Sequence, residues 1–322
     1  MSVRVAAGAR LHFGFQNLSL ARERLYGGVG VALDEPRVVI EAEPAEGVHC
    51  DDGAVAAHTR TAVDLLDVAG VDLTVVERLP RHVGLGSGTQ LAMATLAAVA
   101  AAHDREPRLR ERAPALGRGG RSGVGVAVAE RGGFVVDGGH PTELFTAAPP
   151  ADGAWTVPPV TAHHELPTDW RFVVVVPDTD PGRSGDAEDE SMRTVVERAD
   201  PGIADEIGGV LLRRVLPAAA EGDRTTFGAG VAKLGRLNGA WYADEQGGVY
   251  RPPAGRIVDE LSGCPAVTGT GQSSWGPAVY ALTDAGMAED ARSAARDALD
   301  AVGVDGRIVV TAPANCGLEI DA

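Results

Sequence analysis

The chain has 322 residues, 44% of them hydrophobic, and a formal net charge of −16 at pH 7. This length predicts two domains of ordinary size with packed cores. The acidic balance argues against nucleic acid and against an anionic membrane as partners, because both would repel the protein. The sequence contains no run of eighteen apolar residues and no secretion signal, so we expect no membrane span and a cytoplasmic location.

The basic residues are almost all arginine, since Lys233 is the one lysine among 29 Lys and Arg residues. Such a composition fits either a salt-loving, halophilic organism or a GC-rich genome. The three cysteines, Cys50, Cys264 and Cys316, are too far apart in sequence for a Cys-x-x-Cys metal or redox pair. We therefore expect no disulfide framework and no cysteine metal site.

The first part of the chain reads as strands followed by an alternation of helices and strands. Apolar alternation predicts strands at 3–7, 29–33, 38–42, 71–77 and 134–137. Helical periodicity predicts an amphipathic helix at 54–69, and an alanine-rich run predicts a second helix at 91–103.

Residues 141–168 show no clear period and are interpreted as an edge or linker region. The apolar run 171–176 predicts a buried strand that opens a second domain, so we divide the chain into domains of residues 1–165 and 166–322. The loop 183–188 after it is either a mobile lid or a solvated acidic loop. Further helices are expected at 188–221, 223–239 and 287–302, and further strands at 266–268, 278–282 and 307–311, which gives an α+β fold.

A glycine-rich loop at Pro80–Gln90 leads directly into the alanine-rich helix. Glycines at alternate positions let the backbone bend and approach a ligand, and a helix N-terminus offers free N–H groups to an anion. The alternative is a tight strand-to-helix turn without a ligand. The residues that we predict to bind a phosphate or pyrophosphate are Gly84, Leu85, Gly86, Ser87, Gly88 and Thr89.

Three segments in order along the chain resemble the GHMP-kinase superfamily. They are residues 9–14 (Ala-Arg-Leu-His-Phe-Gly), the loop 80–90, and residues 269–277 (Gly-Thr-Gly-Gln-Ser-Ser-Trp-Gly-Pro). The resemblance implies a two-domain α+β fold, with an N-terminal domain like domain 2 of ribosomal protein S5 and a ferredoxin-like C-terminal domain.

Further segments, among them residues 24–30, 121–127 and 130–140, are most similar to the branch of β-ribofuranosylaminobenzene (or hydroxybenzene) 5'-phosphate synthases. That branch implies an archaeal transferase that joins phosphoribosyl pyrophosphate (PRPP) to a para-hydroxy- or para-aminobenzoate. CO2 and pyrophosphate leave, in a pathway toward a methanopterin-type cofactor. Such a reaction predicts Mg²⁺ as cofactor, because Mg²⁺ favours phosphate oxygens and would neutralise the leaving pyrophosphate. The resemblance also implies a homodimer.

One position separates the synthases from the kinases. GHMP kinases that use a catalytic aspartate often carry it in a Ser-Gly-x-Asp segment, and the comparable stretch here ends at Gly125. A glycine cannot accept a proton from a hydroxyl nucleophile. The alternative function, an ATP-dependent kinase of a small alcohol, is therefore disfavoured unless Asp137 takes that role. A non-catalytic binding protein on the same scaffold is the third hypothesis.

Candidate catalytic residues are cationic or titratable groups beside the glycine-rich segments. A guanidinium suits bidentate binding of phosphate or carboxylate, although a solvated surface arginine is the default alternative. Alternation along a strand places Arg10 and His12 on one face. Asp137 is a candidate Mg²⁺ ligand, or else a turn residue before two glycines. The catalytic candidates are Arg10, His12, Arg24 and Arg121, with Arg81 and Arg118 as weaker candidates at the surface.

The candidate substrate-binding residues are polar or aromatic. Tyr26 and Trp275 could stack on an aromatic substrate, or simply pack in the core. The third glycine loop carries a polar cluster that either binds substrate or caps the next element. The full set is Tyr26, Ser122, His140, Gln272, Ser273, Ser274 and Trp275.

Overall fold

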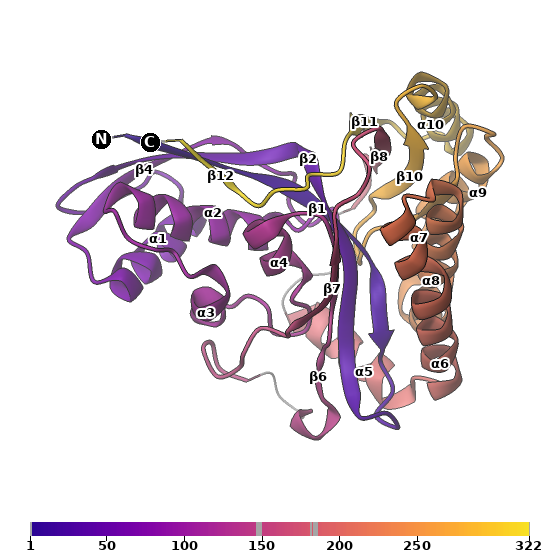
Figure 1. Ribbon diagram of the computed structural model, residues 1–322, viewed down its shortest axis with the longest axis horizontal. Coiled ribbons are helices and arrows are strands. Elements are labelled where there is room, and N and C mark those ends of the chain that lie inside the picture. Colours follow the sequence, from indigo (N-terminus) through magenta and orange to yellow (C-terminus); the bar gives the residue numbers. More distant parts are fainter. Residues whose placement is uncertain (1, 146–149, 181, 183–185, 322) are drawn as a thin grey trace.

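The computed structural model describes residues 2–145, 150–180, 182 and 186–321. Residues 183–185 of the predicted lid lie outside this part. The fold has two sheets, and β1 and β2 run as long strands from the first sheet toward the second (Figure 1). Along β1, Val3, Val5 and Ala7 are buried, while the residues between them are partly exposed, which is the expected alternation of a half-buried strand.

The first sheet has the strand order β12-β1-β2-β4-β3, with β5 and β6 paired to β2 and β7 paired to β5. Neighbours in it are antiparallel except β3 and β4. Its strands are β1 (Val3–Asn17), β2 (Arg24–Pro44), β3 (Gly47–His49), β4 (Gly70–Glu77), β5 (Phe134–Asp137), β6 (His140–Pro141), β7 (Val160–His164) and β12 (Glu319–Asp321).

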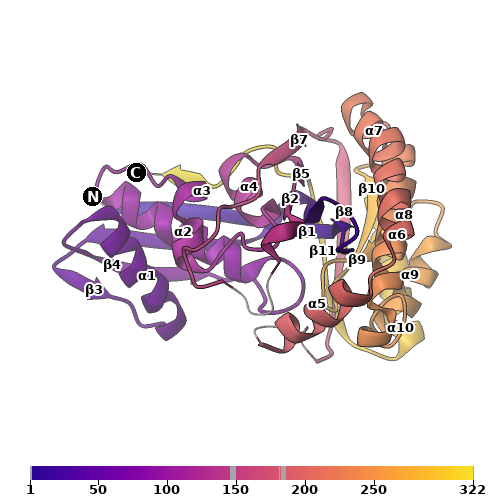
Figure 2. The same cartoon turned by 90° about the horizontal axis from the view of Figure 1, so that it is seen from below.

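Helices cover the first sheet on the side seen in Figure 2. α2 is the central one, because residues 92–100 of its alanine-rich run are all buried against the sheet and against α1. Small side chains let the helix lie close to the strands. The helical elements of this part are α1 (Gly53–Leu66), α2 (Ser87–Ala102), α3 (Leu109–Arg112), the 3-10 turns η1 (Ala113–Leu116) and η2 (Thr142–Leu144), and α4 (Val124–Arg131).

The second sheet is antiparallel, in the order β11-β8-β10-β9. Its chain order and strand order together form the ferredoxin-like arrangement, so the predicted two-sheet α+β fold is confirmed. Its strands are β8 (Trp170–Pro177), β9 (Gly269–Gln272), β10 (Val279–Asp284) and β11 (Gly306–Thr311). Its helices are α5 (Asp186–Arg198), α6 (Pro201–Val210), the π-helical turn η3 (Leu211–Val215), α7 (Leu216–Glu221), α8 (Arg224–Gln246), α9 (Ala254–Ser262) and α10 (Ala288–Val302).

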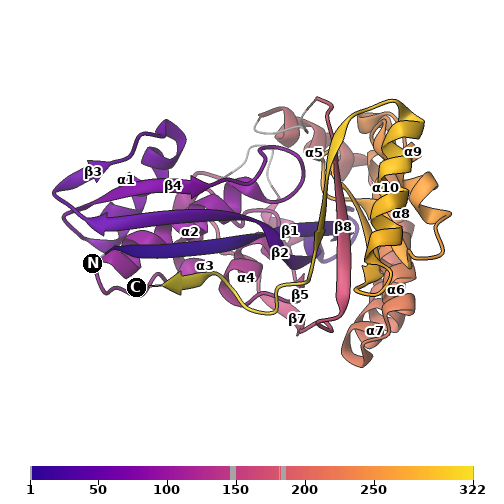
Figure 3. The same cartoon turned by 90° about the horizontal axis from the view of Figure 1, so that it is seen from above.

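The valine run of β8 is buried because each face of the strand meets a different core. Phe172 and Val174 belong to the core that holds Phe13 of β1 and Phe227 of α8, whereas Val173 and Val175 pack with the residues of α9 and α10. Figure 3 shows β8 between the first sheet and the helices at the far end of the molecule. The first sheet and the second therefore share one hydrophobic core.

The structure corrects several sequence predictions. The region 141–168 contains β7, whose residue His163 is half-buried with its Nε2 3.1 Å from the carbonyl oxygen of Gly132. The expected strand at 266–268 begins only at Gly269. α9 was missed although Ala254, Ile257, Val258 and Leu261 carry a helical period and are buried. The division at residue 165 stays a prediction, and β12 returns to pair with β1.

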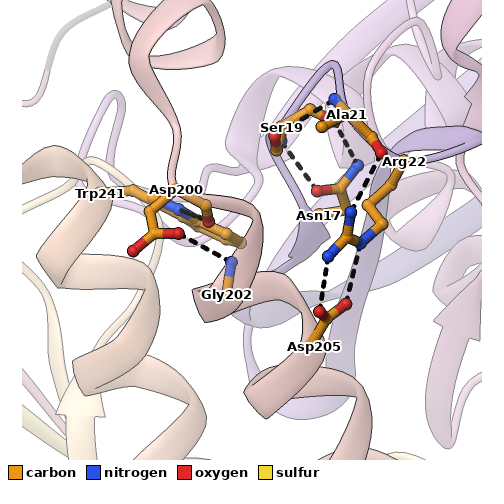
Figure 4. A network of polar contacts seen from close by, with 8 residues as sticks. All are labelled: Asn17, Ser19, Ala21, Arg22, Asp200, Gly202, Asp205 and Trp241. Carbon is orange, nitrogen blue, oxygen red and sulfur yellow. Dashed lines mark hydrogen bonds and ion pairs between the residues drawn. The ribbon is translucent and has the colours of Figure 1, made fainter.

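The tip of the β1–β2 hairpin contacts α6 through a polar network (Figure 4). Asn17 and Ser19 exchange hydrogen bonds that shape the turn. Arg22 then donates two hydrogen bonds to the carboxylate of Asp205, at 2.9 and 2.5 Å. Among the described residues, no helix is both long and apolar enough to cross a membrane.

Candidate active site

A cavity of about 950 Å³ lies where the N-terminus of α2, the loop 117–122, residues 140–145 and 150–156, and α5 meet. It gathers residues from six predicted segments, which are 9–14, 24–30, 80–90, 121–127, 130–140 and 269–277. The cationic side chains in its lining outnumber the carboxylates, which gives an acidic protein a locally positive site. The predicted residues that line it are Arg10, His12, Tyr26, Thr89, Arg121, Ser122, His140 and Ser274.

A line of three polar side chains forms one wall of the site. Ser122 Oγ lies 3.1 Å from Nε2 of His12 and 3.2 Å from Oδ2 of Asp137. The carboxylate of Asp137 also accepts hydrogen bonds from the backbone N–H groups of Gly123 (2.8 Å) and Gly139 (2.9 Å). A Cβ atom at Gly28 would lie 2.2 Å from Ser122 Oγ, so that glycine makes room for this line.

Burial sets the charge of both ends of the line. It raises the pKa of Asp137 to about 6, against the opposing effect of its hydrogen bonds. Burial, helped by the Arg10 charge, lowers the pKa of His12 well below its ordinary value. His12 is therefore neutral and Asp137 ionised at pH 7.

These charges fix the direction of the hydrogen bonds. The hydroxyl of Ser122 has one proton, and an ionised Asp137 can only accept it. The N–H of Val124 also donates to Ser122 Oγ, at 3.3 Å. Nε2 of His12 must then carry a proton and donate to the same oxygen, which leaves Nδ1 as an acceptor. The line thus holds His12 as a neutral base.

The backbone around His12 is tied to the third glycine loop. Ser273 Oγ accepts from the N–H of His12 at 3.0 Å and donates to the carbonyl oxygen of Gly84 at 2.7 Å. The N–H of Ser274 donates to the carbonyl oxygen of His12 at 3.1 Å. Ser273 therefore positions the strand and the loop from behind, whereas Ser274 reaches the cavity.

The phosphate loop divides into a packing part and a helix-starting part. Leu85 is a core residue, and a Cβ at Gly84 would lie 2.1 Å from the carbonyl oxygen of Ser273. Gly86, with φ of 76°, is the N-cap of α2. Of the six predicted residues only Thr89 lines the cavity in the described part of the chain. Gly84 and Leu85 hold the loop against the second sheet, and their predicted phosphate-binding role stays a prediction.

The three arginines predicted as catalytic lie in different places and have different partners. Arg10 donates to the carbonyl oxygen of Gly84 at 2.8 Å and passes over Gly86. Arg121 pairs with Asp189 of α5 inside the cavity. Arg24 does not line the cavity; it donates to the carbonyl oxygens of Gly138 (2.5 Å) and Gly139 (2.7 Å), which stabilises the turn after Asp137. The structure gives it a structural contact, and its predicted catalytic role stays a prediction.

Of the two aromatic candidates, one lines the cavity and the other does not. Tyr26 lines the cavity with a φ of 69°, and its ring centroid lies 5.7 Å from that of Phe15. Trp275 lies outside this cavity and packs on Tyr242, with the two ring centroids 4.5 Å apart. Gln272 is likewise outside it, and accepts from the N–H of Arg251 at 2.8 Å. These two residues support the third glycine loop.

Several residues that line the cavity were not predicted from the sequence as site residues. Arg118, predicted as a surface residue, is half-buried in its wall; Arg81 is exposed as expected. Phe15, Trp155 and Asp189 also line it. Only Phe15 had a signal, because it follows the Arg-Leu-His-Phe-Gly segment.

Packing explains why a glycine stands at position 125. A Cβ atom there would lie 2.9 Å from Cγ2 of Thr89, so the glycine lets α4 approach the first turn of α2. Nε2 of His140 lies 2.6 Å from the carbonyl oxygen of Gly120, which fixes the ring at the cavity edge. Within the described residues, no three His, Cys, Asp or Glu side chains form a group that could hold a metal ion.

The comparisons with known proteins agree with this geometry. Residues 39–133 match the family model described as GHMP kinases N terminal domain. The chain is 34% identical to a "Beta-ribofuranosylphenol 5'-phosphate synthase" of Methanothermobacter thermautotrophicus, over 96% of this chain and 95% of the relative. It is 32% identical to a protein of the same name from Archaeoglobus fulgidus, over 99% of both chains.

The solved structures that resemble the chain include a homoserine kinase from Cytophaga hutchinsonii. The TM-score is 0.64 at 16% identity, over 99% of this chain and 97% of that one. At this identity the likeness concerns the fold.

Proposed function

The chain belongs to the family of beta-ribofuranosylphenol 5'-phosphate synthases, and on that premise we propose that it joins the ribosyl 5-phosphate of PRPP to para-hydroxybenzoate. The product that the relatives' name gives contains a phenol, which favours the hydroxybenzoate over the aminobenzoate. The observation that carries the proposal is the identity of 34% over 96% of the chain.

The reaction exchanges one bond at the sugar and one at the ring. The bond between C1 of ribose and the pyrophosphate oxygen breaks, and the ring carbon that bears the carboxylate forms the new bond to C1. The phenol proton leaves as the ring carbon attacks. The bond to the carboxylate then breaks, CO2 leaves, its electron pair restores the ring, and the phenol oxygen takes the proton back.

His12 is the base that we assign to the phenol proton. Its Nδ1 is left as an acceptor by the hydrogen bonds of Ser122 and Asp137. A base whose pKa lies below the ambient pH is available in its neutral form, and a positioned base contributes to such a step. Ser122 and Asp137 are positioning residues, because they act through His12.

The cations of the cavity are assigned to the anionic groups. Arg10, which lies over Gly86, together with the first turn of α2, binds pyrophosphate and stabilises the charge that develops as it leaves. Arg121 exchanges Asp189 for the benzoate carboxylate, and Tyr26 with Phe15 contacts the ring. These roles need no covalent enzyme intermediate, since positioning and electrostatics suffice.

The proposed role of Mg²⁺ in this site is as part of the substrate. The carboxylate of Asp137 is fully buried and engaged by N–H and O–H donors, so it does not suit the metal role that the sequence suggested. Mg²⁺ prefers phosphate oxygens with one or two carboxylates. We therefore propose that it enters on the pyrophosphate of PRPP. The homodimer implied by the resemblance stays a prediction.

The direct test incubates the purified protein with Mg²⁺, PRPP and para-hydroxybenzoate and follows the release of pyrophosphate and CO2. Parallel reactions contain para-aminobenzoate, or ATP with small alcohols. Equal release of both products with the hydroxybenzoate is expected. ATP turnover with an alcohol and no release from PRPP would replace the synthase by a kinase.

A further inference from the structure

The guanidinium group of Arg118 lies directly over the first turn of α2. A Cβ atom at Gly88 would be 3.1 Å from its Nη1. The backbone is held from the other side, where the indole N–H of Trp155 donates to the carbonyl oxygen of Arg118 at 3.1 Å. The side chain is thus part of the cavity wall beside the helix N-terminus.

No carboxylate of the described residues lies within ion-pair distance of this cation, and its Nε is buried without a hydrogen-bond partner. The one side-chain hydrogen-bond partner that it has in the described part of the chain is His58 of α1, with Nη2 3.3 Å from Nε2 of the ring. Burial and the Arg118 charge lower the pKa of His58 to about 4, so this partner is neutral. The exposed Asp152 is the acid whose charge acts on Arg118.

Other partly buried arginines differ from Arg118 in having a carboxylate partner, although Nε of Arg224 is also buried without a hydrogen bond. Nη2 of Arg110 lies 2.8 Å from Oε2 of Glu130, and Nη1 of Arg224 lies 2.5 Å from Oδ2 of Asp284. A partly desolvated cation without an ion-pair partner is costly, and an anion that enters the cavity would reduce that cost. The N–H groups of the adjacent helix turn favour the same kind of ligand.

We propose that Arg118 and the first turn of α2 bind a phosphate group of the sugar substrate, with His58 as a positioning residue that orients the guanidinium. The substrate class rests on the proposed function. The phosphate can be either the pyrophosphate at C1 or the 5-phosphate of ribose. Arg118 is then a second cation at the helix, beside Arg10.

The test measures binding by calorimetry, with inorganic pyrophosphate, ribose 5-phosphate and PRPP as separate ligands. Charge-assisted bidentate contacts of this kind predict that Arg118→Gln weakens PRPP binding about 10- to 100-fold. The free phosphate compound that loses affinity identifies the group bound. Arg81→Gln is the matched control, because Arg81 is exposed on the loop before α2 and is not in the cavity lining.

Arg118→Lys separates recognition from folding. It keeps the charge but loses the planar fork, so it should bind PRPP with intermediate affinity while its circular dichroism matches wild type. A folded Arg118→Gln that binds all three ligands as wild type does overturns the phosphate assignment. Arg118-dependent pyrophosphate binding in a protein that does not turn over PRPP supports the site and overturns the proposed reaction.

His58 has its own readout, because it acts through Arg118. His58→Leu removes the acceptor and should raise the KM for PRPP several-fold with little change in kcat. His58→Gln retains an acceptor and should restore KM. Equal KM values in wild type and His58→Leu would show that His58 does not position the guanidinium.

Discussion

Besides the shared core, two contacts between the N-terminal half and the C-terminal half of the protein use opposite chemistry. At the hairpin tip, Arg22 and Asp205 form an exposed ion pair. At the inner contact, formed by residues 83–84 and 273–278, backbone meets backbone: the N–H of Ala278 donates to the carbonyl oxygen of Val83 at 3.1 Å, and Ser273 bridges to Gly84. Only the second place touches the active site.

The difference shows where geometry is fixed. Exposed ion pairs are screened by salt and cost side-chain entropy, so they contribute little. A buried contact between backbones has no such freedom, because interiors are packed closely and a shift of either segment breaks its hydrogen bonds. The position of His12 is therefore set by the inner contact.

The largest effect is expected from Gly276→Ala. A Cβ atom there would lie 2.0 Å from the carbonyl carbon of Val83 and 2.2 Å from the nitrogen of Gly84. Neither backbone can move freely, so we expect the free energy of unfolding to fall by roughly 3 kcal/mol. We also expect the variant to lose most of its activity. Denaturant titration measures it. Gly208→Ala in α6, where nothing lies within 4 Å, should keep or raise stability.

Ser122→Ala disconnects His12 from Asp137 without filling or emptying much space. The kcat should fall about 100-fold, because the base loses its fixed tautomer, while the KM for PRPP changes little. Steady-state kinetics checks this. Ser262→Ala in α9 is the control, and a similar kcat for wild type and Ser122→Ala would remove the line from the mechanism.

Asp137→Asn tests the buried charge through pH. The pKa of Asp137 is about 6 in the folded protein against 3.8 as the ordinary value. Between these values the folded state holds the proton more tightly, so stability falls as pH rises from about 4 to about 6 and is level above it. In Asp137→Asn this fall in the free energy of unfolding, on the order of 2 kcal/mol in the wild type, should be absent. Unfolding at pH 4.5 and 6.5 measures it, with the exposed Asp297→Asn as control.

The smallest effect is expected at the hairpin tip. Arg22→Ala removes the exposed ion pair with Asp205 and should leave kcat and KM unchanged. Any drop in the thermal midpoint should shrink at high salt, where wild type and variant converge. A large loss of activity would mean that the tip, and not the inner contact, positions the site.

The sequence predicts local features better than encounters between distant segments. β5 was placed at its observed residues, and Arg10 and His12 both line the cavity as strand alternation predicted. Arg118 was assigned to the surface because nothing in its local sequence says that a cavity would bury it. The contact of Ser122 with Asp137 depends on how α4 packs beside β5, which no spacing of residues encodes.

The pairing of β12 with β1 has a consequence for how the chain is made. Residues 319–321 cover the outer edge of β1 at residues 4–6, and N and C lie side by side in Figure 1. During synthesis that edge stays open until residues 319–321 have left the ribosome. A fragment cut at residue 165 would keep it open permanently, with unpaired N–H and C=O groups that invite aggregation. Linking the two neighbouring ends and opening the chain elsewhere would close the edge early.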